Sequence, residues 1–204
     1  RQPNPALSVQ LPERVYAMDC VHPVLIVAMA QRKMQTFDLK RPNQPLKTFE
    51  SPLKFQSRVV KVFPDKRGYA LGSIEGRCAI RYFNKSDNFA FKCHRVRNQD
   101  IYAVNTISFS SLNTVVTGGG DGSYSIWDTD ARSRLLEGEH LDQSISSSSL
   151  SCDNTILAYG ASYDWSKGAN GYNPNKQSYI GLRVLKPNEI QPKNNNNNNR
   201  SGSY

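Results

Sequence analysis

The run GGGDGSYSIWDTDAR at residues 118–132 constrains the fold of this chain more than any other stretch. Its Asp121-Gly122 pair suits a tight hairpin turn in which both central residues take positive φ. Aromatic and β-branched residues, which favour strands, follow the turn: Tyr124, Ile126 and Trp127. The run therefore predicts a strand that leaves a tight turn and ends at a Trp-Asp dipeptide.

Three similar segments recur along the 204 residues, each with an inner apolar strand, a turn, an aromatic-ended or apolar third strand and a polar outer strand, and a fourth, less complete segment follows them. Repeats of about 40 residues are typical of WD40 β-propeller blades, and their recurrence argues against a β-sandwich. We predict an all-β partial propeller over residues 1–186, with about four C-terminal blades at 9–50, 58–93, 102–137 and 143–185.

The ends of this array carry two further expectations. The fourth blade has a long polar insertion at residues 163–177 and no convincing outer strand, so we expect exposed blade edges, which are templates for strand pairing. The Pro/Asn-rich segment 187–204 has too little apolar area to offset its ordering entropy, and we expect a disordered tail there.

Positive charge is concentrated in the first half of the chain. Residues 1–100 contain 18 Lys and Arg against 8 Asp and Glu, whereas residues 101–204 contain 8 against 9. The net charge of +9 is therefore the sum of +10 and −1. A one-sided basic field attracts polyanions such as RNA, although a basic face also serves simply to keep a protein soluble. Charge alone leaves both interpretations open.

Nothing in the sequence predicts membrane insertion, a metal or a cofactor. There is no run of about 18 apolar residues. The four cysteines, Cys20, Cys78, Cys93 and Cys152, are widely spaced and form no CxxC pair. This spacing argues against a zinc site and favours reduced, buried strand cysteines in a cytosolic or nuclear protein.

The chain also lacks the usual signatures of an enzyme. Its three histidines, His22, His94 and His140, form no HxH or HExxH pattern, and no GxSxG or Walker motif is present. The triple glycine at residues 118–120 leads into a hairpin and not into a helix, which does not suit a phosphate-binding loop. The sequence favours a binding protein over an enzyme.

Candidate binding residues follow the turn of the second repeat and continue into its outer strand. Arg77 comes directly after Glu75-Gly76, and the string FAFKCHRVR supplies Phe91, Lys92, Arg95 and Arg97. Aromatic and Arg residues dominate interface hot spots, and Arg and Lys bind phosphates. Phe91 has an equally simple alternative, as a core aromatic of an outer strand.

Trp127 likewise has two interpretations. Such a Trp packs within its blade and donates its indole N–H to polar groups, a network that Thr117 and Asp121 are well placed to join. A partly exposed Trp127 would instead contact a ligand. Asp128 and Arg132 follow it in a loop, where polar side chains either bind a partner or are solvated.

Seven short strings, taken together, resemble the C-terminal half of the eukaryotic nuclear mRNA export factors, which are seven-bladed WD40 propellers. One string alone is weak, whereas seven in the same order are specific. The resemblance runs from about residue 8 to about residue 185. The strings are SPLK (51–54), ALGSIEGR (70–77), FKCHR (91–95), QDIYAVN (99–105), WD-x-DAR (127–132), LDQ-x-IS (141–146) and ASYDWSKG (161–168).

The resemblance implies a nuclear, non-enzymatic adaptor that shuttles to the cytoplasm, docks on a segment of an FG-repeat nucleoporin at the nuclear pore and binds single-stranded RNA. The binding groove of that family corresponds here to Arg77, Phe91, Trp127, Asp128 and Arg132. Thr129 stands where the family usually has Lys, so one basic contact is lost. We expect Arg77, Phe91, Trp127 and Arg132 to form one patch facing the mouth of the ring.

The alternative is the sister family of mitotic checkpoint adaptors, which has the same fold and a YDW-like insertion before its last strand. The intact FKCHR and IEGR strings and the basic first half argue against it. An enzyme or a ubiquitin-ligase substrate receptor has no positive support in the sequence. Checkpoint and ubiquitin-ligase proteins are further candidate partners.

Overall fold

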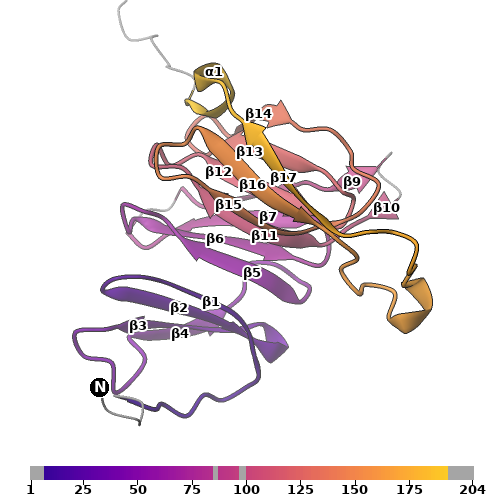
Figure 1. Cartoon of the computed structure of the whole chain (residues 1–204). Helices are drawn as coiled ribbons and strands as arrows, with labels where there is room; N and C mark the ends of the chain where they lie inside the picture. The colour runs from indigo at the N-terminus through magenta and orange to yellow at the C-terminus, as the bar shows by residue number, and fades with distance from the viewer. Residues whose placement is uncertain (1–6, 85–86, 97–99, 193–204) are drawn as a thin grey trace, which may run out of the picture.

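The computed structural model describes residues 7–84, 87–96 and 100–192, and within them nearly all regular structure is β. Three antiparallel sheets of four strands and one of three strands follow one another along the chain, each with its strands in sequence order. Figure 1 shows these sheets stacked side by side, from the first at the bottom to the fourth near the top. They are successive blades of a β-propeller, which confirms the predicted fold class.

The strands of the four blades follow one another in the order of the chain. The first blade contains β1 (Val15–Val21), β2 (Val24–Met29), β3 (Lys33–Asp38) and β4 (Lys47–Glu50). The second contains β5 (Ser57–Val62), β6 (Gly68–Ser73), β7 (Arg77–Tyr82) and β8 (Phe89–Lys92). The third contains β11 (Val104–Phe109), β12 (Val115–Gly119), β13 (Tyr124–Asp128) and β14 (Ser133–Glu137). The fourth contains β15 (Ile145–Leu150), β16 (Ile156–Ala161) and β17 (Tyr179–Val184).

Short elements connect or follow the blades. The strands β9 (Arg95–Val96) and β10 (Asp100–Ile101) form a two-stranded ladder between the second and third blades. Two single turns of 3₁₀ helix, η1 (Ala30–Arg32) and η2 (Ala169–Gly171), lie in the first blade and in the insertion of the fourth. The helix α1 (Pro187–Ile190) follows β17.

Apolar side chains are buried between blades. The first strands are neighbours in space, because β1 contacts β5, β5 contacts β11 and β11 contacts β15. One cluster joins the first two blades, a second joins the middle two and a third joins the last two. All six residues of β6 are buried, since both faces of that strand meet a neighbouring blade. Burial of apolar area between blades is therefore the main force that holds the array together.

The last strand of the fourth blade exposes an apolar row. Ile180, Leu182 and Val184 alternate along β17 with side chains that are 80%, 70% and 71% exposed. Residues two apart in a strand share a face, so the three side chains line one face of the sheet. In the described part of the chain β17 pairs with β16 alone. This strand has the exposed edge that the sequence predicts.

Two expectations are wrong in part. The chain does not lose its structure at residue 187, because α1 buries Ile190 against the third and fourth blades and Thr114 Oγ1 donates a hydrogen bond to the Ile190 carbonyl at 3.0 Å. The rest of the predicted tail, from residue 193, lies outside the described residues. The expectation of buried cysteines fits Cys78 and Cys93, whereas Cys20 and Cys152 are exposed. The four cysteines form no disulfide.

Candidate functional site

An aromatic pair lies between the second and third blades. The ring centroids of Phe91 in β8 and Trp127 in β13 are 4.4 Å apart, and Phe89 lies 6.1 Å from Phe91. Both phenylalanines are half-buried and point toward the third blade, whereas Ala90 and Lys92 point away and are exposed. The period of two along β8 thus gives one face to the blade contact and the other to solvent.

Two arginines cover these rings. The guanidinium carbon of Arg132 lies 4.9 Å from the Phe89 ring centroid, and that of Arg134 lies 5.8 Å from the Trp127 ring centroid. Both distances suit cation–π contacts. Arg132 is exposed and pairs with Asp87, while Arg134 pairs with Glu137 at 2.7 Å. Phe89, Phe91, Trp127, Arg132 and Arg134 are called the Phe91 cluster below.

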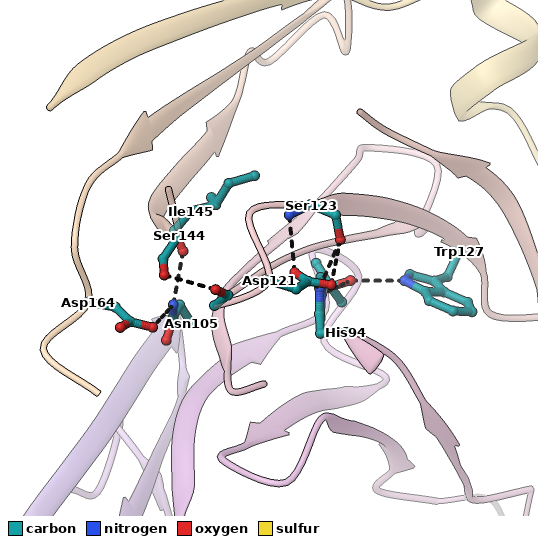
Figure 2. Close-up of polar contacts among 10 residues, drawn as sticks. His94, Asn105, Asp121, Ser123, Trp127, Ser144, Ile145 and Asp164 are labelled. Atoms are coloured by element: carbon teal, nitrogen blue, oxygen red, sulfur yellow. Dashed lines mark hydrogen bonds and ion pairs between the residues drawn. The ribbon is translucent and has the colours of Figure 1, made fainter. Parts of the chain in front are cut away.

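A buried hydrogen-bond chain fixes the other side of Trp127, as Figure 2 shows. Its indole N–H donates to Thr117 Oγ1 at 3.0 Å, and the same hydroxyl lies 3.0 Å from His94 Nε2. His94 Nδ1 lies 2.9 Å from Asp121 Oδ1. An indole N–H only donates and a carboxylate only accepts, so a neutral His94 with its proton on Nδ1 satisfies every group in the chain. Trp127 is therefore anchored as well as partly exposed.

Ser123 closes this network at the carboxylate. Its hydroxyl donates to Asp121 Oδ2 at 2.8 Å, and its backbone N–H donates to Oδ1 at 3.1 Å. Burial by itself raises the pKa of Asp121, but the hydrogen bond from His94 and the bonds from Ser123 outweigh it and hold the pKa below its ordinary value of 3.8. The carboxylate is ionised at neutral pH.

The turn that carries Asp121 differs from the predicted one. Gly122 takes a φ of 78°, but Asp121 does not have positive φ, so the expectation of positive φ at both central residues is wrong. The loop is longer than a two-residue hairpin, since Gly119 N–H bonds to the Ser123 carbonyl and Gly122 N–H to the Gly119 carbonyl. A longer loop of this kind needs positive φ at the glycine alone. The ordinary backbone of Asp121 lets its carboxylate reach His94.

Asp128 is buried and positions the loop that carries Arg132. Its side chain is almost fully covered, and its Oδ1 accepts hydrogen bonds from the backbone N–H groups of Asp130 and Ala131 at 2.9 Å each. Arg132 follows with a φ of 52°. The prediction of Asp128 as a contact residue does not fit its burial, and its place in the loop is that of a positioning residue.

Three other predicted cations lie at the β6–β7 turn. Arg77 pairs with Glu75 at 3.5 Å, and Arg95 donates to the Glu75 carbonyl at 2.7 Å. Lys92 is opposite Arg77 in the β7–β8 ladder and is exposed. Arg97 lies outside the described residues.

The two groups of cations are on different faces of the array. Consecutive antiparallel strands place their connections alternately at two edges of a blade. At one face, Asn113 of the β11–β12 turn bonds Asp65 of the β5–β6 turn at 3.0 Å, and Arg67 bonds Asp130 of the β13–β14 turn at 3.3 Å. Arg132 is also in the β13–β14 turn and therefore lies at this face. Arg77 follows the β6–β7 turn at the opposite face, next to Cys78, which pairs with Phe91. A single patch of Arg77, Phe91, Trp127 and Arg132 stays a prediction.

The opposite face carries a second surface, formed by the insertion of the fourth blade. Trp165 and Tyr172 stack with an interplanar angle of 2° and a centroid distance of 5.7 Å, and Tyr163 lies 5.6 Å from Trp165. Trp165 is 61% exposed and Tyr172 is 54% exposed. A cleft of about 490 Å³ beside them is lined by residues of the insertion and of the linker before β15.

Asp164 ties this insertion to the third blade, as Figure 2 also shows. Asn105 Nδ2 donates to Asp164 Oδ2 and to the Ile145 carbonyl, at 3.1 Å each. Burial by itself raises the pKa of Asp164, and bonds from Ser166, Asn105 and Ser144 outweigh it, so the pKa lies below 3.8. Asn105 Oδ1 is buried and has no hydrogen-bond partner among the described residues.

The sequence missed two kinds of functional residue. One is His94 as a network residue, for which a His after an outer strand, a Thr within a second strand and an Asp in the next turn are together a signal. The other is the pair of exposed aromatics, Trp165 and Tyr172, which lie in a segment that is otherwise polar. No group of the described His, Cys, Asp and Glu residues is arranged to hold a metal ion. No helix in the described ranges has the length and hydropathy to span a bilayer.

Comparison with known proteins identifies close relatives. The mRNA export factors of Xenopus tropicalis and Danio rerio are 47% identical to this chain over 209 residues, which is 95% of the chain and 56% of each relative. That of Mus musculus is 46% identical over 206 residues, covering 94% of the chain and 56% of the relative. The chain thus spans about half the length of the curated relatives it matches.

No protein-family model matches the chain. Among solved structures, the computationally designed Ika4 protein superposes with a TM-score of 0.65 at 14% identity, over 87% of this chain and 97% of that one. At this identity the likeness concerns the fold alone.

Proposed function

We propose that this chain, which is 47% identical to the mRNA export factors over 95% of its length, belongs to their family and acts in messenger RNA export as a non-catalytic adaptor. It binds single-stranded RNA through the Phe91 cluster and docks on a segment of an FG-repeat nucleoporin, shuttling between the nucleus, the pore and the cytoplasm. The checkpoint alternative has no support among the relatives reported above.

The observation that carries the RNA part is the combination of half-buried rings with cations at one surface. Phe91 and Trp127 are held in place from behind, Trp127 by its bond to Thr117 and both by the contact between blades. Arg132 is exposed beside them. Aromatic side chains stack on unpaired bases, at about 1–3 kcal/mol per base, and Arg binds the phosphates between them.

The basic first half of the chain supports the same proposal. The net charge of +10 over residues 1–100 attracts a polyanion from a distance, and the attraction weakens with salt. Arg77, Lys92 and Arg95 lie on the other face from Arg132, so they contribute to this general attraction and not to the stacking site.

The second surface suits a protein segment. Exposed Trp and Tyr side chains beside a cleft are typical of interfaces with peptides, since their large rings bury much area at small entropic cost. Trp165 and Tyr172 are such residues, and the adjacent cleft contains Asp142, Asp164, Lys167 and Lys176 for polar contacts. We assign the nucleoporin segment to this surface.

Fluorescence anisotropy with a labelled oligouridylate of about 15 nucleotides tests the RNA part. Phe91→Leu with Arg132→Ala keeps apolar volume at the blade contact but removes a ring and a cation, and we expect at least about tenfold weaker binding, equivalent to one lost stacked base. Lys54→Ala with Phe55→Ala is the matched control, because both residues are exposed and lie outside the cluster. Equal affinity of wild type and the Phe91 variant at moderate salt would exclude this site.

Capture on an immobilised FG-repeat nucleoporin segment tests the protein part. Trp165→Ala with Tyr172→Ala should abolish capture while leaving RNA affinity unchanged, because the two surfaces lie on different faces. If that variant is captured as well as the wild type, the nucleoporin segment binds elsewhere.

A further inference from the structure

A second cleft lies between the first and second blades. It has a volume of about 670 Å³, and its walls come from β3 and β4 on one side and from β6, β7 and the segment after β7 on the other. Its principal side chains are Phe37, Lys47, Phe49, Tyr69, Arg81 and Phe83. We call it the Arg81 groove.

Aromatic rings line this groove from the core to the surface. Phe49 and Tyr69 have centroids 6.2 Å apart, and Phe83 lies 6.0 Å beyond Tyr69. Tyr69 is buried, whereas Phe83 is 40% exposed. The groove therefore offers ring faces whose inner members are fixed by packing and whose outer member is open to a ligand.

The cations of the groove are available to an anion. Lys47 is exposed, with its Nζ 5.9 Å from the Phe49 ring centroid, and neither it nor Arg81 forms an ion pair among the described residues. The two lining carboxylates have partners, since Glu50 pairs with Arg32 at 3.5 Å and Asp38 accepts the Lys40 backbone N–H at 2.9 Å. Planar rings beside unpaired cations suit a ligand with flat rings and negative charge.

The Arg81 groove is the repeat counterpart of the Phe91 cluster. Phe49 pairs with Met34, the second residue of β3, as Phe91 pairs with Cys78, the second residue of β7. The third strands of the two following blades correspond in the same way. Arg81 is the penultimate residue of β7, and Trp127 is the penultimate residue of β13. Phe91 contacts Trp127, and Phe49 lines the same cleft as Arg81, so the corresponding position of the next blade is an aromatic ring in one place and a cation in the other.

The two sites are adjacent along the chain as well. Asn88 lines the Arg81 groove, and the next residue, Phe89, belongs to the Phe91 cluster and contacts Arg132. The Arg81 groove and the Phe91 cluster therefore adjoin at the start of β8. A flexible strand that crosses the outer rim of the second blade can contact both.

We infer that the Arg81 groove is a second subsite for single-stranded RNA, in which a base lies against Phe83 and Phe49 while Arg81 and Lys47 bind phosphates. The inference rests on the proposed function and extends it: one RNA strand occupies both blade contacts. An acidic peptide with aromatic side chains has related chemistry, but the repeat relation to the Phe91 cluster and the short path between the sites favour RNA.

Anisotropy with two RNA lengths tests this inference. A long RNA occupies both subsites at once, so loss of either subsite lowers its affinity sharply. A short RNA occupies only one subsite at a time, so the remaining subsite still binds it. For Arg81→Ala with Phe83→Ala we expect about tenfold weaker binding of an oligouridylate of about 15 nucleotides, and at most about a twofold change for one of about 4 nucleotides. Lys54→Ala with Phe55→Ala, another exposed cation and aromatic pair, should leave both unchanged.

Salt dependence gives a second readout that a structural defect would not produce. Each phosphate contact on a single strand contributes about 0.7 to the slope of log affinity against log salt concentration. Lys47→Ala with Arg81→Ala should therefore lower that slope by about 1.4 for the longer RNA. Thermal unfolding of each variant confirms that its fold is intact.

The outcomes separate this inference from the proposed function. If the wild-type protein binds neither RNA, both are wrong. If Phe91→Leu with Arg132→Ala weakens binding but Arg81→Ala with Phe83→Ala matches the control, the Arg81 groove is not an RNA subsite and the proposed function stands. Loss of binding to an acidic aromatic peptide, with RNA affinity unchanged, would assign the groove to a protein partner and overturn the inference.

Discussion

The ring of Trp127 lies 4.4 Å from that of Phe91 in the neighbouring blade, while its indole N–H is bonded to the buried hydroxyl of Thr117 at 3.0 Å. One side chain therefore belongs both to the surface between two blades and to a buried polar network. The two interpretations of Trp127 that the sequence leaves open are compatible, because they concern opposite ends of the same indole. This division can be tested by substitutions that change one end alone.

Trp127→Phe should reduce stability while largely preserving RNA affinity. It keeps a ring against Phe91 but removes the donor to Thr117, which is fully buried. Loss of a buried hydrogen bond with one partner left unsatisfied costs about 1–3 kcal/mol. Urea unfolding measures the loss, and anisotropy measures the affinity. A stability equal to that of the wild type would contradict the assigned network.

Asp121→Asn should remove part of the acid sensitivity of the fold. The pKa of Asp121 is below 3.8 in the folded state, so the ionised carboxylate stabilises the protein above that pH, and the contribution is lost as pH falls below it toward the folded pKa. The substitution should lower the free energy of unfolding at neutral pH and flatten its decline below about pH 4. Urea unfolding between about pH 3 and 7 gives both quantities. Parallel pH profiles of variant and wild type would disprove the role of this carboxylate.

Asp87→Ala should strengthen RNA binding with little effect on stability. Asp87 pairs with Arg132 at the surface, and exposed ion pairs contribute about 0–1 kcal/mol to folding. Without the carboxylate, Arg132 is free to bind a phosphate, and we expect about threefold higher affinity at low salt. Anisotropy at two salt concentrations checks this, with Glu139→Ala as the control because Glu139 is exposed and in the next linker. Weaker binding by Asp87→Ala would indicate that the ion pair is needed to orient Arg132.

Gly118→Ala should destabilise the contact between the third and fourth blades. A Cβ at Gly118 would lie 2.8 Å from Ile145 Cγ2 and 2.8 Å from Thr106 Cγ2, so the blades would have to separate slightly. Overpacking of this kind costs about 1–3 kcal/mol. Gly160 is the matched control in the next blade, because its nearest neighbour, Ser146 Oγ, is 3.6 Å away. Equal thermal stabilities of Gly118→Ala and Gly160→Ala would show that the blades are not in such close contact.

Ile180→Lys with Leu182→Lys should reduce self-association of this chain. Both side chains are more than two-thirds exposed on β17, which is an edge strand of the described fourth blade. Lys on an edge opposes pairing with a second copy through charge and desolvation. Analytical ultracentrifugation over a range of protein concentrations should show a monomer for the variant and concentration-dependent association for the wild type. Identical sedimentation of the two would mean that this edge is not used.

Local patterns allowed most of the fold to be predicted. The turn signal at Gly122, the alternation in β8 and the apolar inner strands each depend on neighbours within a few residues, and all are present in the structure. The start of the tail was not predictable in the same way. The four residues of α1 are ordered by burial of Ile190 and by the bond from Thr114, which is 76 positions earlier in the chain.

The candidate site shows the same limit more clearly. The sequence by itself determined which residue types are available, namely the Phe of β8, the Trp-Asp dipeptide and the surrounding arginines, because strand alternation and turn chemistry are local. The tertiary structure alone decided that Phe91 meets Trp127, that His94 from one blade's linker completes the network of the next, and that Arg77 and Arg132 lie on opposite faces. The physical reason is that these relations depend on how whole blades stack, and stacking is set by apolar burial summed over both sheets.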